Sequence, residues 1–131
     1  MNPHYQKVIG FAQDLGLEIK VQEEKDGILV VHEESKGIYN MILNVDGEIL
    51  VMEQLLYRLS QQSEKHFLRL LQLNRKLIHG AFVIDDEAQQ VLFRDSLQVE
   101  NLDFNEFEGS INALSLGLAE FSSELLALNK G

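Results

Sequence analysis

Two Asp-Gly dipeptides, Asp26-Gly27 and Asp46-Gly47, constrain the fold of this chain more than any other feature. Each lies between runs of β-branched and other apolar residues, a combination that is typical of a tight turn in a β-hairpin. Ser35-Lys36-Gly37 adds a further turn signal, so strand and turn alternate about every ten residues. We therefore predict an antiparallel meander whose strands are residues 28–32, 38–45 and 48–53, with a further strand around Ile19 and Val21.

Helical signals lie on both sides of this meander. Asn2 is a suitable N-cap, and Pro3 fits the first turn because the amide it lacks has no partner inside a helix. Gly16 is a natural end for this first helix, which we predict over residues 3–15. A second helix is predicted from Ser63 to Gly80.

The last third of the chain predicts two short strands and a long helix. Asp103 and Glu106 form a capping box, which marks the start of that helix. The strands are residues 81–84 and 91–99, joined by a polar loop. The sequence thus indicates an α+β fold in one domain, residues 1–131. Three helices cover one antiparallel sheet of five to six strands, in the order α-βββ-α-ββ(β)-α.

Composition limits the classes of partner and compartment. The 131 residues include 11 Lys and Arg against 21 Asp and Glu, a net charge of −10 that disfavours nucleic acid and anionic membranes as partners. Cysteine is absent, which excludes disulfides and thiolate metal sites. We find no uninterrupted apolar run of about 18 residues and no pattern of a secretory signal. These features predict a cytoplasmic protein.

Motifs for catalysis or metal binding are missing from the sequence. The four histidines, His4, His32, His66 and His79, include no i, i+4 pair on a predicted helix, and we expect them at the surface or at helix ends. Phosphate-binding glycine loops and a nucleophile elbow are also absent. We therefore expect no enzyme activity, no catalytic residue, no cofactor and no metal.

Asn74 places an amide in the apolar stripe of the second predicted helix. A buried amide destabilises a protein unless its hydrogen bonds are satisfied. One interpretation is a bond to the backbone of a neighbouring strand or loop. The other is a polar group that fixes the register at a dimer seam, as buried asparagine does in coiled coils.

Charge is segregated along the chain. Residues 58–79 carry a net charge of +4, whereas residues 100–131 carry −5. Lys65, Arg69 and Lys76 fall near one face of the second predicted helix. Complementary surfaces of this kind orient protein association, although an ordinary solvated helix face would produce the same pattern.

A hydrophobic pattern with a few polar positions extends over most of the chain. It runs from a Leu-Leu helix segment ending in asparagine, through a strand that follows glycine and an acidic turn, to a second strand and a long helix. The segments are Leu70-Leu71-Gln72-Leu73-Asn74, Gly80-Ala81-Phe82-Val83-Ile84-Asp85, Val91-Leu92-Phe93-Arg94, Leu97 and Leu102-Asp103. This pattern resembles the type III secretion chaperone-like superfamily, which includes the class I chaperones of the CesT (Tir-chaperone) family and the YbjN-like proteins.

The resemblance implies a homodimer, often formed through the second helix, that needs no cofactor. In class I chaperones it also implies binding of an extended, largely unfolded segment of a secreted effector. We therefore expect a non-enzymatic, dimeric module that binds a partner protein. The expected partner-binding residues are Val31, Leu50 and Met52, and the expected dimer residues are Leu70, Leu71, Asn74 and Leu77.

Two alternatives stay open at this point. A YbjN-like regulatory or accessory protein of the same fold would bind a folded partner through Lys65, Arg69 and Lys76. A small enzyme with a site built from scattered carboxylates is the third hypothesis, and no motif supports it.

Overall fold

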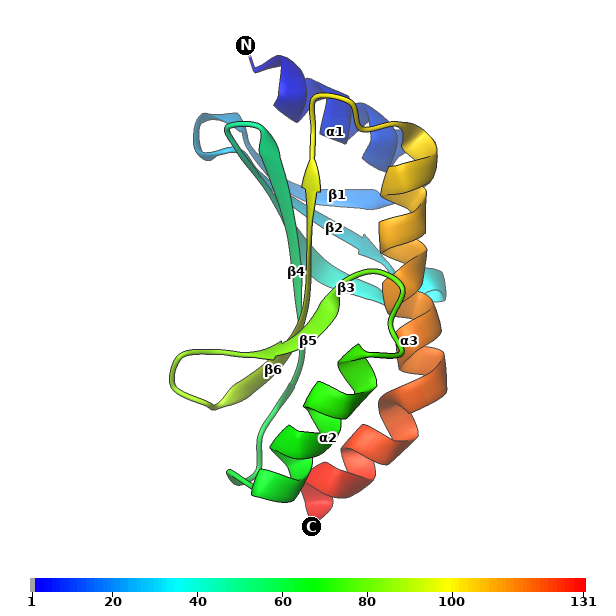
Figure 1. Ribbon diagram of the computed structural model, residues 1–131. Helices are drawn as coiled ribbons and strands as arrows, with labels where there is room; N and C mark the ends of the chain where they lie inside the picture. Colours follow the sequence, from blue (N-terminus) through cyan, green and yellow to red (C-terminus); the bar gives the residue numbers. More distant parts are fainter. Residues whose placement is uncertain (1) are drawn as a thin grey trace.

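A computed structural model describes residues 2–131 as one antiparallel sheet with three helices on one side (Figure 1). The strand order in the sheet is β1-β2-β3-β4-β6-β5. The α+β class and the predicted order of elements are confirmed. The elements are α1 (Pro3–Asp14), β1 (Glu18–Glu23), β2 (Ile28–Glu33), β3 (Ile38–Asp46), β4 (Ile49–Arg58), α2 (Glu64–Asn74), β5 (Ala81–Ile84), β6 (Gln90–Gln98) and α3 (Phe104–Lys130).

The turns between the first four strands are of two kinds. Asp46 pairs with Ile49, so Gly47 lies in the two-residue hairpin that Asp-Gly predicts. The other two turns are longer, because a single 3-10 turn precedes Gly27 and another precedes Gly37. Both of these glycines have a left-handed backbone, with φ of 69° and 73°. A Cβ on Gly27 would also lie 2.2 Å from the carbonyl oxygen of Val45, so only glycine fits there.

The predicted caps of the outer helices are present. Asn2 Oδ1 accepts hydrogen bonds from the backbone N–H groups of His4 and Tyr5, at 3.0 and 3.2 Å. Asp103 Oδ1 accepts from Glu106 N–H at 2.8 Å. Side-chain oxygens at these positions satisfy amides that have no partner inside the helix, which fixes where α1 and α3 begin.

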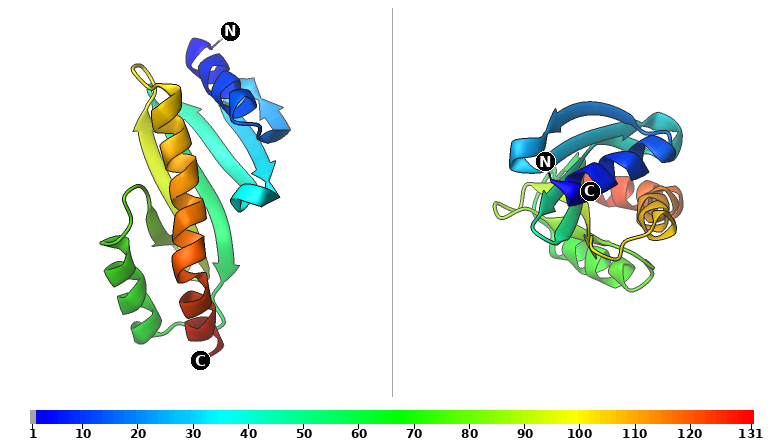
Figure 2. Two further views of the ribbon diagram at one scale, coloured as in Figure 1. Left: turned by 90° about the vertical axis from the view of Figure 1, so that its right-hand side faces the viewer. Right: turned by 90° about the horizontal axis from the view of Figure 1, so that it is seen from above.

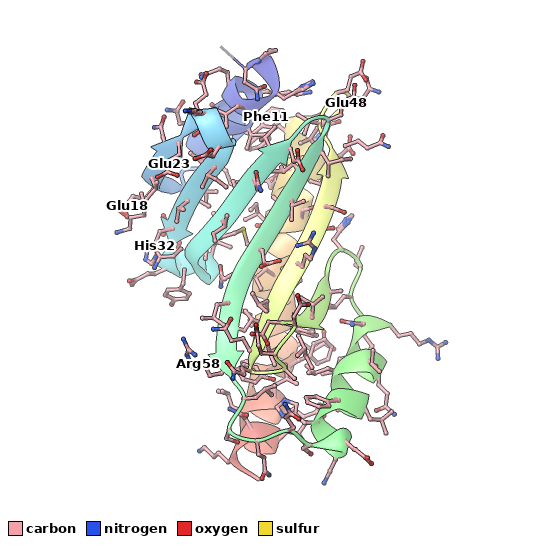
Figure 3. All side chains as sticks on the ribbon, turned by 90° about the vertical axis from the view of Figure 1, so that its left-hand side faces the viewer. Phe11, Glu18, Glu23, His32, Glu48 and Arg58 are labelled. Carbon is pink, nitrogen blue, oxygen red and sulfur yellow. The ribbon has the colours of Figure 1, made fainter. Side chains whose placement is uncertain are left out.

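The interior consists of two apolar clusters that meet along the sheet. The larger one joins α1, the first four strands and the first half of α3, and the smaller one joins α2, β5, β6 and the second half of α3. Leu56 and Leu77 pack against both clusters. The opposite face of the sheet carries no helix, as Figures 2 and 3 show. Side chains that alternate along each strand therefore divide into one covered set and one open set.

α3 has the length and composition of a membrane span, with a mean hydropathy of 1.2 over its most apolar 18-residue window. This departs from the sequence expectation that no segment approaches such a span. Core helices of soluble proteins meet the same criterion, and in this structure Phe107, Ile111 and Leu114 pack against the sheet. Only 28% of the window is buried, however, so α3 leaves much apolar surface uncovered.

Candidate protein-binding surfaces

Asn74, the last residue of α2, binds the backbone of β5 with both ends of its amide. Nδ2 donates to the carbonyl oxygen of Phe82 at 3.1 Å, and Oδ1 accepts from the N–H of Phe82 at 2.7 Å. β5 pairs with β6 on its other side, so the amide occupies the position that a further strand would take. The backbone interpretation of Asn74 is thereby confirmed, and the amide has no capacity left to fix a dimer seam.

The expected dimer residues of α2 do not share a face. Leu70 is 3% exposed in the smaller cluster and Leu77 is half-buried, whereas Leu71 is 70% exposed. The expectation was wrong because α2 ends at Asn74 and not at Gly80, so helical spacing does not apply beyond that residue. The apolar side chains that α2 presents to solvent are Leu68 and Leu71.

The expected partner-binding residues of the sheet lie on its covered face. Val31, Leu50 and Met52 are at most 1% exposed, so no partner can contact them in this structure. Alternation along a strand gives two sets of side chains, and the sequence does not say which set the helices cover. The exposed apolar residues belong to the other set, which includes Val21, Ile42, Ile49 and Leu55.

The segregated charges partly neutralise each other inside the chain. Arg69 of α2 forms a two-point ion pair with Glu124 of α3, with Nη2 3.1 Å from Oε1 and Nε bonded to Oε2. The hydrogen bond from Arg69 holds the pKa of Glu124 below its usual value. Lys65 and Lys76 stay exposed. Of the three expected cations, Arg69 therefore joins two helices, and two remain available to a partner.

His66 was expected at the surface or a helix end, but it is 1% exposed beneath the first turn of α2. Its Nε2 atom lies 2.8 Å from the Tyr57 hydroxyl, and the two rings stack with an interplanar angle of 19°. Burial lowers the pKa of His66 and raises the pKa of Tyr57 to about 12. Its sequence signal was the helical spacing from His66 to the apolar Leu70 and Leu73.

The largest cavity is an open groove of about 640 Å³ along the outer side of α3, here called the α3 groove. One wall is the segment that follows α2, Lys76 to His79, and the other is α3 from Gly109 to Phe121. The segment lies close to α3 because α3 has glycines beneath it. A Cβ on Gly117 would stand 3.2 Å from a methyl carbon of Leu77. This close approach explains helix-interior glycines that each cost about 1 kcal/mol relative to alanine.

The lining of the α3 groove is mostly apolar. Ile78 is 87% exposed and Leu116 is 67% exposed, and Phe121 closes one end. Lys76 and Glu120 supply opposite charges at the rim. Large apolar side chains standing this far into water mark a contact surface.

A second open feature lies where β3 leaves β4. The β3–β4 ladder ends with Ile42 opposite Glu53, although β4 continues to Arg58. Among residues 2–131 no strand pairs with this last part of β4 on the side toward β3, and we call residues 54–58 the β4 edge. In Figure 2 (left) β4 runs past the end of β3 with open space beside it.

Gln54 holds the two diverging strands together. Its side chain is 2% exposed, with Nε2 donating to Gly37 O at 3.1 Å and Oε1 accepting from Tyr39 N–H at 3.0 Å. A cavity of about 260 Å³ adjoins the β4 edge, between Tyr39 on one side and Leu118 and Leu126 of α3 on the other. Sequence reasoning missed this site, because an exposed edge depends on which strands part and where.

These surfaces are built for contact with other molecules, and the part of the chain that the structure describes holds no cluster of three or more histidine and acidic side chains placed for a metal ion. The family model CesT_Tir_1 matches residues 1–131, the full length of the sequence. The chain belongs to the CesT_Tir_1 family. Membership in this chaperone-like family identifies it as a non-enzymatic binding protein, in agreement with the sequence prediction.

Solved structures agree with the family in their fold. The CesT_Tir_1 chain superposes on YbjN from E. coli with a TM-score of 0.72 and 14% identity, covering 93% of each chain. It superposes on a chain of the HopA1–SchA chaperone–effector complex with a TM-score of 0.63 and 16% identity, covering 88% of this chain and 91% of that one. No curated protein sequence is significantly similar.

Proposed function

We propose that this CesT_Tir_1 protein is a homodimer that binds an extended, largely unfolded segment of a partner protein. The observation that supports this most directly is the α3 groove, which is apolar, open and about 640 Å³ in volume. Family membership and the fold shared with a chaperone–effector complex support a polypeptide as the occupant.

The dimensions of the α3 groove suit a short extended segment. Gly109 and Phe121 are twelve helical residues apart, about 18 Å at roughly 1.5 Å per residue. An extended chain covers that distance in five or six residues at about 3.3 Å each. Ile78 and Leu116 would then lose water on binding, which is favourable at about 25 cal/mol per Å² of apolar surface.

The groove can be tested with an unfolded polypeptide of known composition, such as a reduced and carboxymethylated globular protein carrying fluorescein. Leu116→Glu places a charge in the groove without touching either core, and we expect about tenfold weaker binding in fluorescence anisotropy. Ile49→Glu is the matched control, because Ile49 is 39% exposed on the open face of the sheet. Equal binding by both variants and the wild type would remove the groove from this proposal.

The homodimer is the second part of the proposal. Leu68 and Leu71 are 57% and 70% exposed on α2, and a second copy of the chain would cover them. Size-exclusion chromatography with light scattering measures the mass directly. A strictly monomeric species at tens of micromolar would contradict the dimer. Leu71→Glu should convert a dimer to a monomer with an unchanged circular dichroism spectrum.

We also propose that residues 1–131 act as one domain in the cytoplasm, with neither nucleic acid nor a membrane as partner. The matching family spans the full sequence, which supports one domain. The net charge of −10 supports the choice of partner class, because phosphate-rich surfaces repel an acidic protein.

A second candidate function is that of a YbjN-like accessory or regulatory protein outside any secretion system. YbjN itself is described as a candidate transcription regulator. The observation that favours this alternative is the pair of exposed cations, Lys65 and Lys76, which stay free to contact a folded acidic partner. Reversing both charges should abolish binding of that partner in a pull-down, and an unchanged set of partners would exclude it.

A further inference from the structure

The β4 edge offers unpaired backbone groups in addition to an apolar surface. In the two-residue hairpin Asp46 and Ile49 exchange hydrogen bonds, so odd-numbered residues of β4 direct their N–H and C=O groups toward β3. Glu53 is the last of these with a β3 partner, Ile42. Leu55 points its backbone the same way, to the side that β3 has left.

Side-chain amides close both ends of this stretch and leave its middle open. Gln54 supplies the hydrogen bonds at one end, to Gly37 and Tyr39. At the other end Asn129 of α3 donates from Nδ2 to the carbonyl oxygen of Arg58 at 2.9 Å. A bulge between Leu55 and Tyr57 limits the length of the open part. Figure 3 shows Arg58 at the end of β4 that lies away from Glu48.

The stretch lacks the usual protection of an edge strand. Natural edges carry lysine, proline or inward-pointing charges that prevent pairing with another chain. Gln54, Leu55, Leu56 and Tyr57 include none of these. Leu55 is 45% exposed, and the cavity of about 260 Å³ beside it is large enough for an apolar side chain.

We infer that an extended segment of a partner protein adds to the sheet as a short strand along the β4 edge and places one apolar side chain in the adjoining cavity. This inference rests on the proposed function and names a docking site separate from the α3 groove. Unpaired N–H and C=O groups in a row recognise another extended backbone, and the cavity selects the side chain.

A partner segment fits this edge better than a second folded copy does. Tyr39 and Leu126, each 50% exposed, stand on either side of the edge and restrict access to it. The gap admits a single strand, whereas the rim of another sheet would bring its flanking side chains with it. Pairing between two copies is therefore an outcome that the test must detect.

The test selects short random peptides on the full-length chain and measures the strongest binders by fluorescence anisotropy. We expect peptides with large apolar residues at alternate positions. N-methylation of the peptide amides that face Leu55 should weaken binding about tenfold, whereas N-methylation of the intervening amides should not. This contrast identifies backbone pairing and does not require any variant of the protein to fold.

Leu55→Pro removes the backbone N–H that the peptide would contact, and an edge position tolerates proline because its N–H has no partner within the chain. We expect about tenfold weaker binding by Leu55→Pro and a smaller loss by Leu55→Ala, which keeps the N–H. Ser122→Trp, which fills the cavity from α3, should also weaken binding.

Three outcomes would overturn the inference. Peptides that bind but are insensitive to N-methylation and to Leu55→Pro do not pair with β4. If they are sensitive instead to Leu116→Glu, the proposed function stands and this site falls. If no peptide is selected, both fall. A dimer that Leu55→Pro converts to a monomer would assign the edge to a second copy.

Discussion

The side-chain amide of Asn74 takes the place of a strand beside Phe82. Its two hydrogen bonds, 2.7 and 3.1 Å long, satisfy the N–H and the C=O of one β5 residue. Gln54 does the same for Gly37 and Tyr39 at the other parting of the sheet. Two amides therefore set where the sheet ends, one at the outer edge of β5 and one where β3 leaves β4.

Asn74→Ala should lower the free energy of unfolding by about 2 kcal/mol, because two hydrogen bonds to a buried backbone are lost. Denaturant unfolding followed by circular dichroism measures this change. The control is Asn101→Ala, an exposed asparagine in the turn before α3, which should change stability little. Equal effects of the two substitutions would show that the amide does not hold β5.

Gly80 combines a left-handed backbone with close contact to Phe93. Its φ is 74°, and a Cβ there would lie 2.3 Å from Cζ of the Phe93 ring. Gly47 has a similar φ of 61° with open space around it. Backbone strain alone costs about 1–2 kcal/mol at either position.

Gly80→Ala should therefore destabilise the protein more than Gly47→Ala, by a further 1–3 kcal/mol or so from overpacking against the ring. Thermal and denaturant unfolding of the two variants give this difference. If the two variants are equally stable, the contact with Phe93 imposes no constraint.

The buried His66 should make stability depend on pH in the acid range. Its folded pKa is lowered, so below its usual pKa of about 6.5 the unfolded chain binds more protons than the folded one. The free energy of unfolding is then fully present above about pH 6.5 and falls as the pH drops through the folded pKa. His66→Phe should flatten this dependence, and an unchanged profile would contradict it.

Tyr57 predicts a loss of stability at the alkaline end. Its folded pKa of about 12 is above the usual value of about 10, so stability is present below pH 10 and is lost as the pH rises toward 12. Tyr57→Phe should remove this loss. Absorbance of the ionised phenol, followed alongside unfolding, distinguishes Tyr57 from the other tyrosines.

The ion pair between Arg69 and Glu124 is solvent-exposed, so we expect a small contribution that salt screens. Arg69→Glu and Glu124→Arg should each destabilise the contact between α2 and α3 at low ionic strength, and the double reversal should restore it. A double-mutant cycle at low and high salt measures the coupling. Coupling that high salt leaves unchanged would mean that the pair acts through packing.

The sequence predicted the elements with local signals and missed those that depend on the third dimension. The hairpin at Asp46-Gly47 and the caps at Asn2 and Asp103 are set by neighbouring residues, and all three are present. The end of α2 was placed at Gly80, because Leu77 and Ile78 continue the apolar stripe beyond Asn74. The helix ends earlier because Asn74 turns to the backbone of β5, a contact that spacing does not reveal.

The candidate site was harder to predict than the fold. Val31, Leu50 and Met52 have the right chemistry for a binding surface, but alternation along a strand is symmetric between covered and open faces. The α3 groove arises because residues 76–79 cross the glycines of α3, and the β4 edge arises because two strands part. Each feature depends on tertiary geometry and has no periodic signature.

α3 also determines when this chain can fold during synthesis. Phe107, Ile111 and Leu114 complete the larger cluster, and Phe121 and Leu125 complete the smaller one. Both interiors thus wait for the segment that the ribosome makes last among these elements. Until α3 emerges, the apolar face of the meander has no cover, and the nascent chain presents the kind of surface that the finished protein is proposed to bind.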